Sequence, residues 1–116
     1  MSPERKPVGQ RRTPPPVARA LRTIGEDLAA WRKLRGLTQR QLADRAGVAR
    51  TTLVRLEGGD GGVSVENVLR VARALGILGA IPPAFDPYES DIGRLRSGEQ
   101  LPQRVRPRAL RDPDDG

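Results

Sequence analysis

Apolar residues recur at helical spacing in the segment that follows the proline-rich N-terminus. The residues that share this spacing are Ile24, Leu28, Trp31 and Leu34. Intervals of four and three residues place them on one face of an amphipathic helix. Thr23 and Glu26 have the spacing of a capping box, so the helix is expected to begin at Thr23 and to end at Gly36. On this interpretation Trp31 belongs to the core.

The next two helices are predicted from the residues at their ends. Thr38, with Gln41 three residues later, is typical of an N-cap, and Gly47 is expected to end that helix. The following helix is expected to run from Ala49 to Glu57. The side chains expected to face inward from these two helices are Leu42, Ala43, Ala46, Leu53 and Leu56.

A fourth helix is predicted after the glycine-rich turn at residues 58–62. Ser64 is its expected N-cap, and Gly76 its expected end. Its inward face is expected to hold Val65, Val68, Leu69, Ala72 and Leu75. No segment has the alternating pattern of a strand. The sequence therefore predicts an all-α fold, a compact domain of four to five helices with flexible N- and C-terminal tails.

Composition divides the chain into three parts. Residues 1–16 carry five prolines and few apolar side chains, and are expected to form a disordered basic arm. Residues 17–80 hold the predicted helices. Residues 81–116 form a tail rich in proline and arginine, suited to partner binding or dimerisation, with a short turn of helix expected at residues 92–96.

The charge balance and the missing residue types narrow the chemistry. The chain has 21 Lys and Arg against 14 Asp and Glu, and its formal net charge is +7. This excess favours a polyanionic partner, nucleic acid before membrane. Without Cys or His there is no thiolate nucleophile, no Ser-His-Asp triad and no zinc site of the Cys/His type. We therefore expect a cytoplasmic protein that is not an enzyme and needs no cofactor or metal.

The second and third helices are spaced as a helix-turn-helix. Gly47 can adopt the positive φ of a tight turn, and the small Ala43 lets the third helix approach closely. The outer face of the third helix then holds Arg50, Thr51, Val54 and Arg55. Such a face is free to enter the major groove of DNA.

The same residues resemble the Cro/Xre-type helix-turn-helix family of repressors. The run Arg35-Gly36-Leu37-Thr38-Gln39 is followed eight residues later by Gly47-Val48, and the phrase Val71-Ala72-Arg73-Ala74-Leu75-Gly76 closes the fourth helix. The resemblance covers about half of the chain. It implies a lambda-repressor-like domain that acts as a DNA-binding repressor, typically as a homodimer on an operator.

The resemblance also implies roles for individual residues. Gln39 would contact phosphate and support the recognition helix, and Arg50, Thr51 and Arg55 would read bases. The complete set of expected DNA-binding residues is Thr38, Gln39, Arg40, Arg50, Thr51, Thr52 and Arg55. Arg32 would form a structural ion pair with Glu57.

Two positions depart from the family's pattern. Ala49 stands where the family usually has a Ser or Thr N-cap, which is expected to weaken the start of the third helix by about 0.5–2 kcal/mol. Gly58 replaces a frequent Asn that contacts phosphate. The resemblance therefore does not predict which backbone groups of the long glycine-rich turn contact phosphate.

The tail resembles that of HipB-like antitoxins, which accompany HipA-type kinase toxins, around Phe85-Asp86-Pro87-Tyr88 and residues 91–94 and 101–106. This similarity implies a HipA-like toxin as a further partner. Phe85 and Tyr88 would either pack on the fourth helix or contact a partner, and Glu89 and Asp91 fit a capped turn better than a metal site. The alternative to a DNA-binding repressor is a protein-binding adaptor that keeps the helix-turn-helix fold without reading DNA.

Overall fold

The computed structural model describes residues 12–100, and all regular structure within them is helical. The elements are α1 Pro15–Leu34, α2 Gln39–Ala46, α3 Arg50–Glu57, α4 Val65–Leu75, the 3₁₀ turn η2 Leu78–Ala80, α5 Ile81–Phe85, the 3₁₀ turn η3 Pro87–Glu89 and α6 Asp91–Gln100. The predicted all-α fold is confirmed. Most of the predicted basic arm (1–11) and the end of the tail (101–116) lie outside the described residues.

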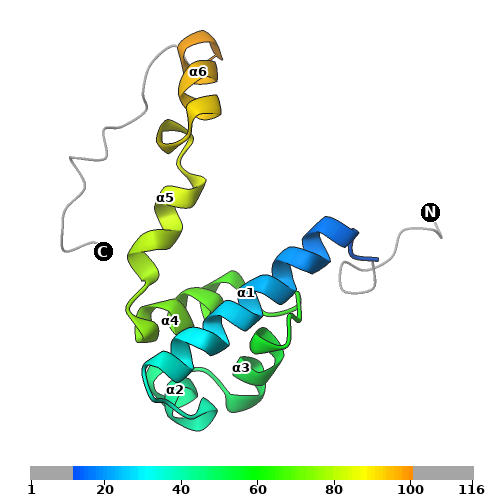
Figure 1. Ribbon diagram of the computed structural model, residues 1–116, viewed down its shortest axis with the longest axis vertical. Coiled ribbons are helices and arrows are strands. Elements are labelled where there is room, and N and C mark those ends of the chain that lie inside the picture. The colour runs from blue at the N-terminus through cyan, green and yellow to red at the C-terminus, as the bar shows by residue number, and fades with distance from the viewer. Residues whose placement is uncertain (1–11, 101–116) are drawn as a thin grey trace, which may run out of the picture. The chain divides into compact units, whose positions relative to one another are not determined.

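The chain divides into two compact units, residues 1–76 and residues 77–116, and each is described by itself. In the first unit, α1 and α2 both pack against α3 and α4 (Figure 1). The buried apolar side chains come from all four helices and from the link between α1 and α2: Leu28, Leu37, Leu42, Ala43, Ala46, Leu53, Leu56, Val71, Ala72 and Leu75. This single small core is what holds α3 in place.

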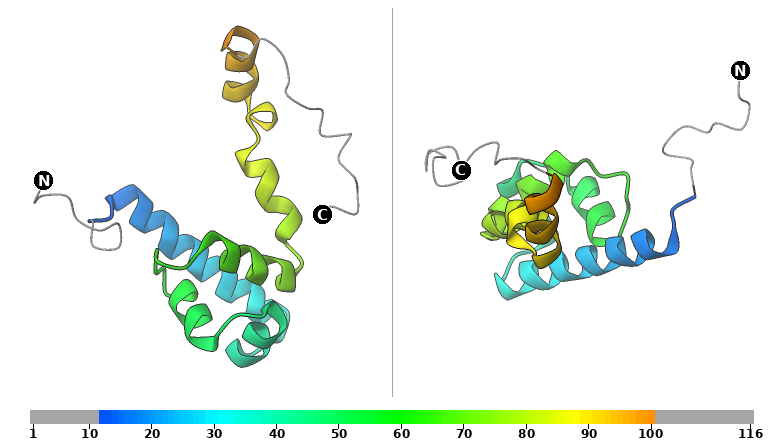
Figure 2. Two further views of the ribbon diagram at one scale, coloured as in Figure 1. Left: turned by 180° about the vertical axis from the view of Figure 1, so that it is seen from behind. Right: turned by 90° about the horizontal axis from the view of Figure 1, so that it is seen from above.

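Helix α1 begins eight residues earlier than the capping-box pattern predicted. It starts at Pro15, and Thr23 lies inside it. Prolines at the first two helical positions supply a preset φ and lack the N–H groups that would have no partner there. The carbonyl of Pro14 accepts the first helical hydrogen bond from Ala18 N at 2.9 Å. Figure 2 shows the first turns of α1 extending beyond the other helices of this unit.

The buried face of α1 also differs from the prediction. Of the four predicted inward residues only Leu28 is buried, whereas Ile24, Trp31 and Leu34 are exposed. The prediction of Trp31 as a core residue is therefore wrong, and its ring lies 5.5 Å from the Arg35 guanidinium. Gly25 is buried in place of these side chains. The spacing of apolar residues does not indicate the buried face of α1, because Gly25 is not a typical core residue.

The cap predictions for α2 and α4 are confirmed. Thr38 Oγ1 accepts from Gln41 N at 3.0 Å while Gln41 Oε1 accepts from Thr38 N at 2.9 Å, which completes the capping box. Ser64 Oγ accepts from Asn67 N at 3.1 Å at the start of α4.

The face of α4 was predicted only in part. Ala72 and Leu75 are buried as expected, but Val65 at the first helical position is 73% exposed and Val71 is buried in its place. The packing of α4 against α2 and α1 decides which side of α4 faces the core, and the exposed Val65 in its first turn lies outside that core.

The described part of the second unit, residues 77–100, is held together by local hydrogen bonds. Asp86 Oδ1 accepts from Tyr88 N at 2.9 Å, and Ser90 Oγ accepts from Gly93 N at 2.9 Å at the start of α6. Helix α6 is longer than the predicted turn at residues 92–96. Phe85 is 83% exposed and Tyr88 is half-buried.

Candidate nucleic-acid interface

The turn between α2 and α3 requires glycine. Gly47 has φ of 72°, and its N–H donates to the carbonyl of Ala43 at 2.9 Å. Val48 N donates to the same carbonyl at 3.1 Å, so the chain reverses tightly at the end of α2. A Cβ at Gly47 would lie 3.2 Å from Nη1 of Arg70 in addition to straining the backbone.

The outer face of α3 is exposed, as the sequence predicted. Arg50, Thr51, Val54 and Arg55 line a shallow apolar hollow on the surface of the helix. Leu53 and Leu56 point the other way and are buried, while Thr52 is half-buried at the edge. Helix α3 therefore presents a ridge of mixed guanidinium, hydroxyl and apolar groups.

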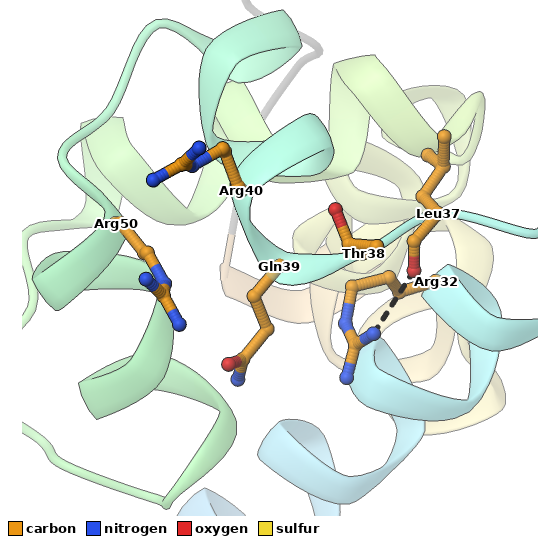
Figure 3. A pocket seen from close by; sticks show the side chains of 6 residues that line it. All are labelled: Arg32, Leu37, Thr38, Gln39, Arg40 and Arg50. Atoms are coloured by element: carbon orange, nitrogen blue, oxygen red, sulfur yellow. Dashed lines mark hydrogen bonds between the residues drawn. The ribbon is translucent and has the colours of Figure 1, made fainter.

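A second hollow lies beside the first turns of α2 and α3 (Figure 3). Its lining consists of Arg32, Leu37, Thr38, Gln39, Arg40 and Arg50. Figure 3 shows the side chain of Arg50 extending toward that of Gln39, with Arg40 on the other side of Arg50. Two arginines from different helices therefore line one hollow.

Arg40 and Arg50 form no ion pair within residues 12–100, and other exposed arginines, such as Arg22, Arg45 and Arg73, share this property. Arg55 pairs with Asp60 at 2.7 Å and Arg70 with Glu66 at 2.8 Å, whereas no carboxylate of the described residues lies within pairing distance of Arg40 or Arg50. Their positive charge is therefore available to an external anion.

The first turn of α3 adds backbone donors to this site. Its N-cap is Ala49, and no side chain accepts a hydrogen bond from the helix N-terminus there. The first N–H groups of a helix have no partner inside the helix, and together with the helix dipole they favour an anion. Because Ala49 replaces the usual Ser or Thr, no N-cap side chain accepts a hydrogen bond from the first N–H groups of α3. These donors therefore remain available to a ligand.

Helix α3 is tied to α1 and α2 by a nearly buried ion pair. Arg32 donates from Nε to Glu57 Oε2 at 2.8 Å and from Nη2 to Oε1 at 3.1 Å, which confirms the expected pair. Arg32 Nη1 also donates to the carbonyl of Leu37 at 3.0 Å. Gln39 Nε2 donates to Glu57 Oε1 at 2.9 Å, so Gln39 supports α3 through Glu57. Contact between Gln39 and phosphate remains a prediction.

The expected DNA-binding residues occupy different positions in this arrangement. Arg40, Arg50, Thr51 and Arg55 are exposed, whereas Gln39 and Thr52 are half-buried, and the hydroxyl of Thr38 is engaged in the α2 cap. Asp60, which binds Arg55, is not among the residues predicted from the sequence. The five-residue spacing of these opposite charges on the turn after α3 was the available signal.

Two other kinds of site have no support in the described part of the chain. Residues 12–100 contain no cluster of three or more acidic, His or Cys side chains placed to bind a metal ion. The Glu89–Asp91 segment instead includes the start of α6, where Asp91 pairs with Arg94. No helix among the same residues has both the length and the apolar character of a membrane span.

Comparison with known proteins finds similarity over the segment that carries this site. Residues 28–78, which include α2, α3 and α4, match the model of a helix-turn-helix family. A protein of Methanothermobacter thermautotrophicus, described as an uncharacterized HTH-type transcriptional regulator, is 51% identical over 45 residues. That alignment covers 39% of this chain and 65% of the relative, so the chain spans less than two thirds of the relative's length.

Proposed function

We propose that this chain is a transcriptional regulator that binds double-stranded DNA through α3. One observation carries the proposal: Arg40 and Arg50, which form no ion pair within residues 12–100, line a common hollow beside the first turn of α3, whose N-terminus has no side-chain cap. The match of residues 28–78 to a helix-turn-helix family and the description of the relative support the same function.

In the proposed complex α3 lies in the major groove. Arg50, Thr51 and Arg55 contact base edges, and the exposed Val54 meets thymine methyl groups. Arg40, the first-turn N–H groups and the polar groups of Thr38, Gln39 and Thr52 contact phosphates and fix the orientation of the domain. Glu57 holds α3 in the required orientation through Arg32.

The finer parts of the proposal are repression and a homodimer. A small core of this kind gains stability from a partner subunit. Two copies place their recognition helices in successive major grooves, about 34 Å apart, on a pseudo-palindromic operator. Repression then follows when the operator overlaps the site that RNA polymerase must occupy.

Arg40→Ala and Arg55→Ala test the proposal and distinguish the proposed phosphate contact of Arg40 from the proposed base contact of Arg55. We expect wild-type affinity for the DNA upstream of its own gene to fall steeply with salt, because bound cations are released from DNA. Arg55→Ala should weaken binding to the preferred site about tenfold and relax one base position. Arg40→Ala should also weaken binding to unrelated duplexes and make the salt dependence shallower, because Arg40 is the proposed phosphate contact.

Binding titrations over a range of salt concentrations, with footprinting of the preferred site, measure both effects. Glu66→Gln on α4 is the control, because Glu66 lies outside the proposed interface. A protein that binds no duplex in a salt-dependent manner would instead be the adaptor considered above.

The antitoxin form of the proposal assigns the second unit to a HipA-like kinase toxin. The exposed Phe85, Ile92 and Leu95 supply apolar contacts for such a partner. We expect the tagged full chain to co-purify with a kinase encoded by an adjacent gene and Phe85→Ser to reduce the amount recovered. A gene without a kinase neighbour, or recovery that Phe85→Ser leaves unchanged, contradicts this form and leaves the DNA-binding proposal standing.

A further inference from the structure

Arg55 and Asp60 are joined at both the side chain and the main chain. Arg55 Nε donates to Asp60 Oδ2 at 2.7 Å, and Asp60 N donates to the carbonyl of Arg55 at 3.0 Å. The second carboxylate oxygen, Oδ1, accepts from Gly62 N at 2.7 Å. The position of the carboxylate is therefore fixed from two sides.

The end of α3 determines where Asp60 lies. Gly59 has φ of 84° and donates to the carbonyl of Leu56 at 3.0 Å, so that residues 55–60 form a Schellman motif. A Cβ at Gly59 would lie 3.2 Å from the Cα of Arg22, which shows how closely the turn approaches α1. Packing against α1 thus holds the carboxylate beside Arg55.

Stability gives no adequate reason for this pair. The side chains of Arg55 and Asp60 are 50% and 42% exposed, and exposed ion pairs contribute little to folding. A carboxylate near the C-terminal end of a helix also interacts unfavourably with the helix dipole. A negative charge on a face that approaches a polyanion weakens binding to any DNA.

We propose that Asp60 is a positioning residue that makes Arg55 a reader of guanine rather than a general contact to phosphate. This inference rests on the proposed function. The pair uses Nε and leaves Nη1 and Nη2 without a hydrogen-bond acceptor among the described residues. That edge of a guanidinium matches the O6 and N7 atoms of guanine. The carboxylate also offsets the attraction of Arg55 to phosphate, and a weaker attraction to all sequences increases discrimination.

Both groups carry their charges at neutral pH. The hydrogen bond from Arg55 lowers the pKa of the Asp60 carboxyl below its ordinary value, and the same hydrogen bond raises the pKa of Arg55. The pair therefore persists over the pH range in which DNA binding is measured.

Asp60→Ala and Asp60→Asn separate the charge of Asp60 from its geometry. The full-length chain and each variant are used to select sites from a pool of random duplexes, and affinities are then measured for the selected site and an unrelated duplex. Asp60→Ala should reduce the preference for guanine at the position read by Arg55 about tenfold. Both variants should bind the unrelated duplex several-fold more tightly, with a steeper salt dependence.

Glu66→Gln is the matched control, because it also removes an exposed carboxylate from an arginine pair. It should change neither the preference nor the binding of unrelated DNA. The inference fails if Asp60→Ala keeps the wild-type preference, or if Glu66→Gln and Asp60→Asn increase unrelated binding equally. If the wild-type chain selects no site at all, the proposed DNA-binding function fails as well as the inference about Asp60. If the wild-type chain selects a site but Asp60→Ala keeps its preference, only the inference about Asp60 fails.

Discussion

Replacing Glu57 with alanine is expected to lower the free energy of unfolding by about 3–5 kcal/mol, because it leaves a nearly buried guanidinium without its carboxylate. The side chains of Arg32 and Glu57 are only 13% and 7% exposed. Glu57 accepts hydrogen bonds from both Arg32 and Gln39, so both of these residues lose a partner in the variant. Urea or thermal unfolding followed by circular dichroism measures the loss.

Two comparisons make this prediction specific to the buried pair. Glu66→Ala breaks the exposed pair with Arg70 and should cost only about 0.5 kcal/mol. The double variant Arg32→Met, Glu57→Leu should be much less destabilised than Glu57→Ala, because no unpaired charge remains in the core. A loss in Glu57→Ala no larger than that in Glu66→Ala would show that the pair does not hold α3 in place.

Gly25→Ala is expected to lower the free energy of unfolding by about 3 kcal/mol, although alanine is the better helix former. A Cβ at residue 25 would lie 2.6 Å from the carbonyl oxygens of both Leu56 and Glu57. These are backbone atoms, so relief requires α1 and α3 to move apart. Because Glu57 ends α3, the same movement should also weaken DNA binding in titrations with the selected site.

Thr23→Ala is the control on the same helix. Thr23 is exposed in the middle of α1, so its replacement should change the free energy of unfolding by no more than about 0.5 kcal/mol. If Thr23 were an N-cap, as its capping-box spacing suggested, the cost would be about 1 kcal/mol. Equal losses in Gly25→Ala and Thr23→Ala would contradict the close approach of α1 and α3.

The exposed ridge of α3 could be predicted because its determinants are close together in the chain. Gly47 permits the turn, and Leu53 and Leu56 turn one side of α3 inward, which leaves Arg50 and Arg55 outside. The pairing of Arg55 with Asp60 could not be predicted in the same way. It depends on the positive φ of Gly59 and on the contact between the turn and Arg22 of α1.

The sequence by itself determined the α2–α3 turn and the ends of α2 and α4, because caps such as Thr38, Ser64 and Gly76 act on backbone groups within a few residues. Only the tertiary structure decided which side of α1 is buried. Gly25 and Arg32 lie on that side because α3 supplies a close backbone and a carboxylate from distant positions in the chain. Burial of a glycine and an arginine depends on such partners, and the spacing of apolar residues along the chain gives no information about them.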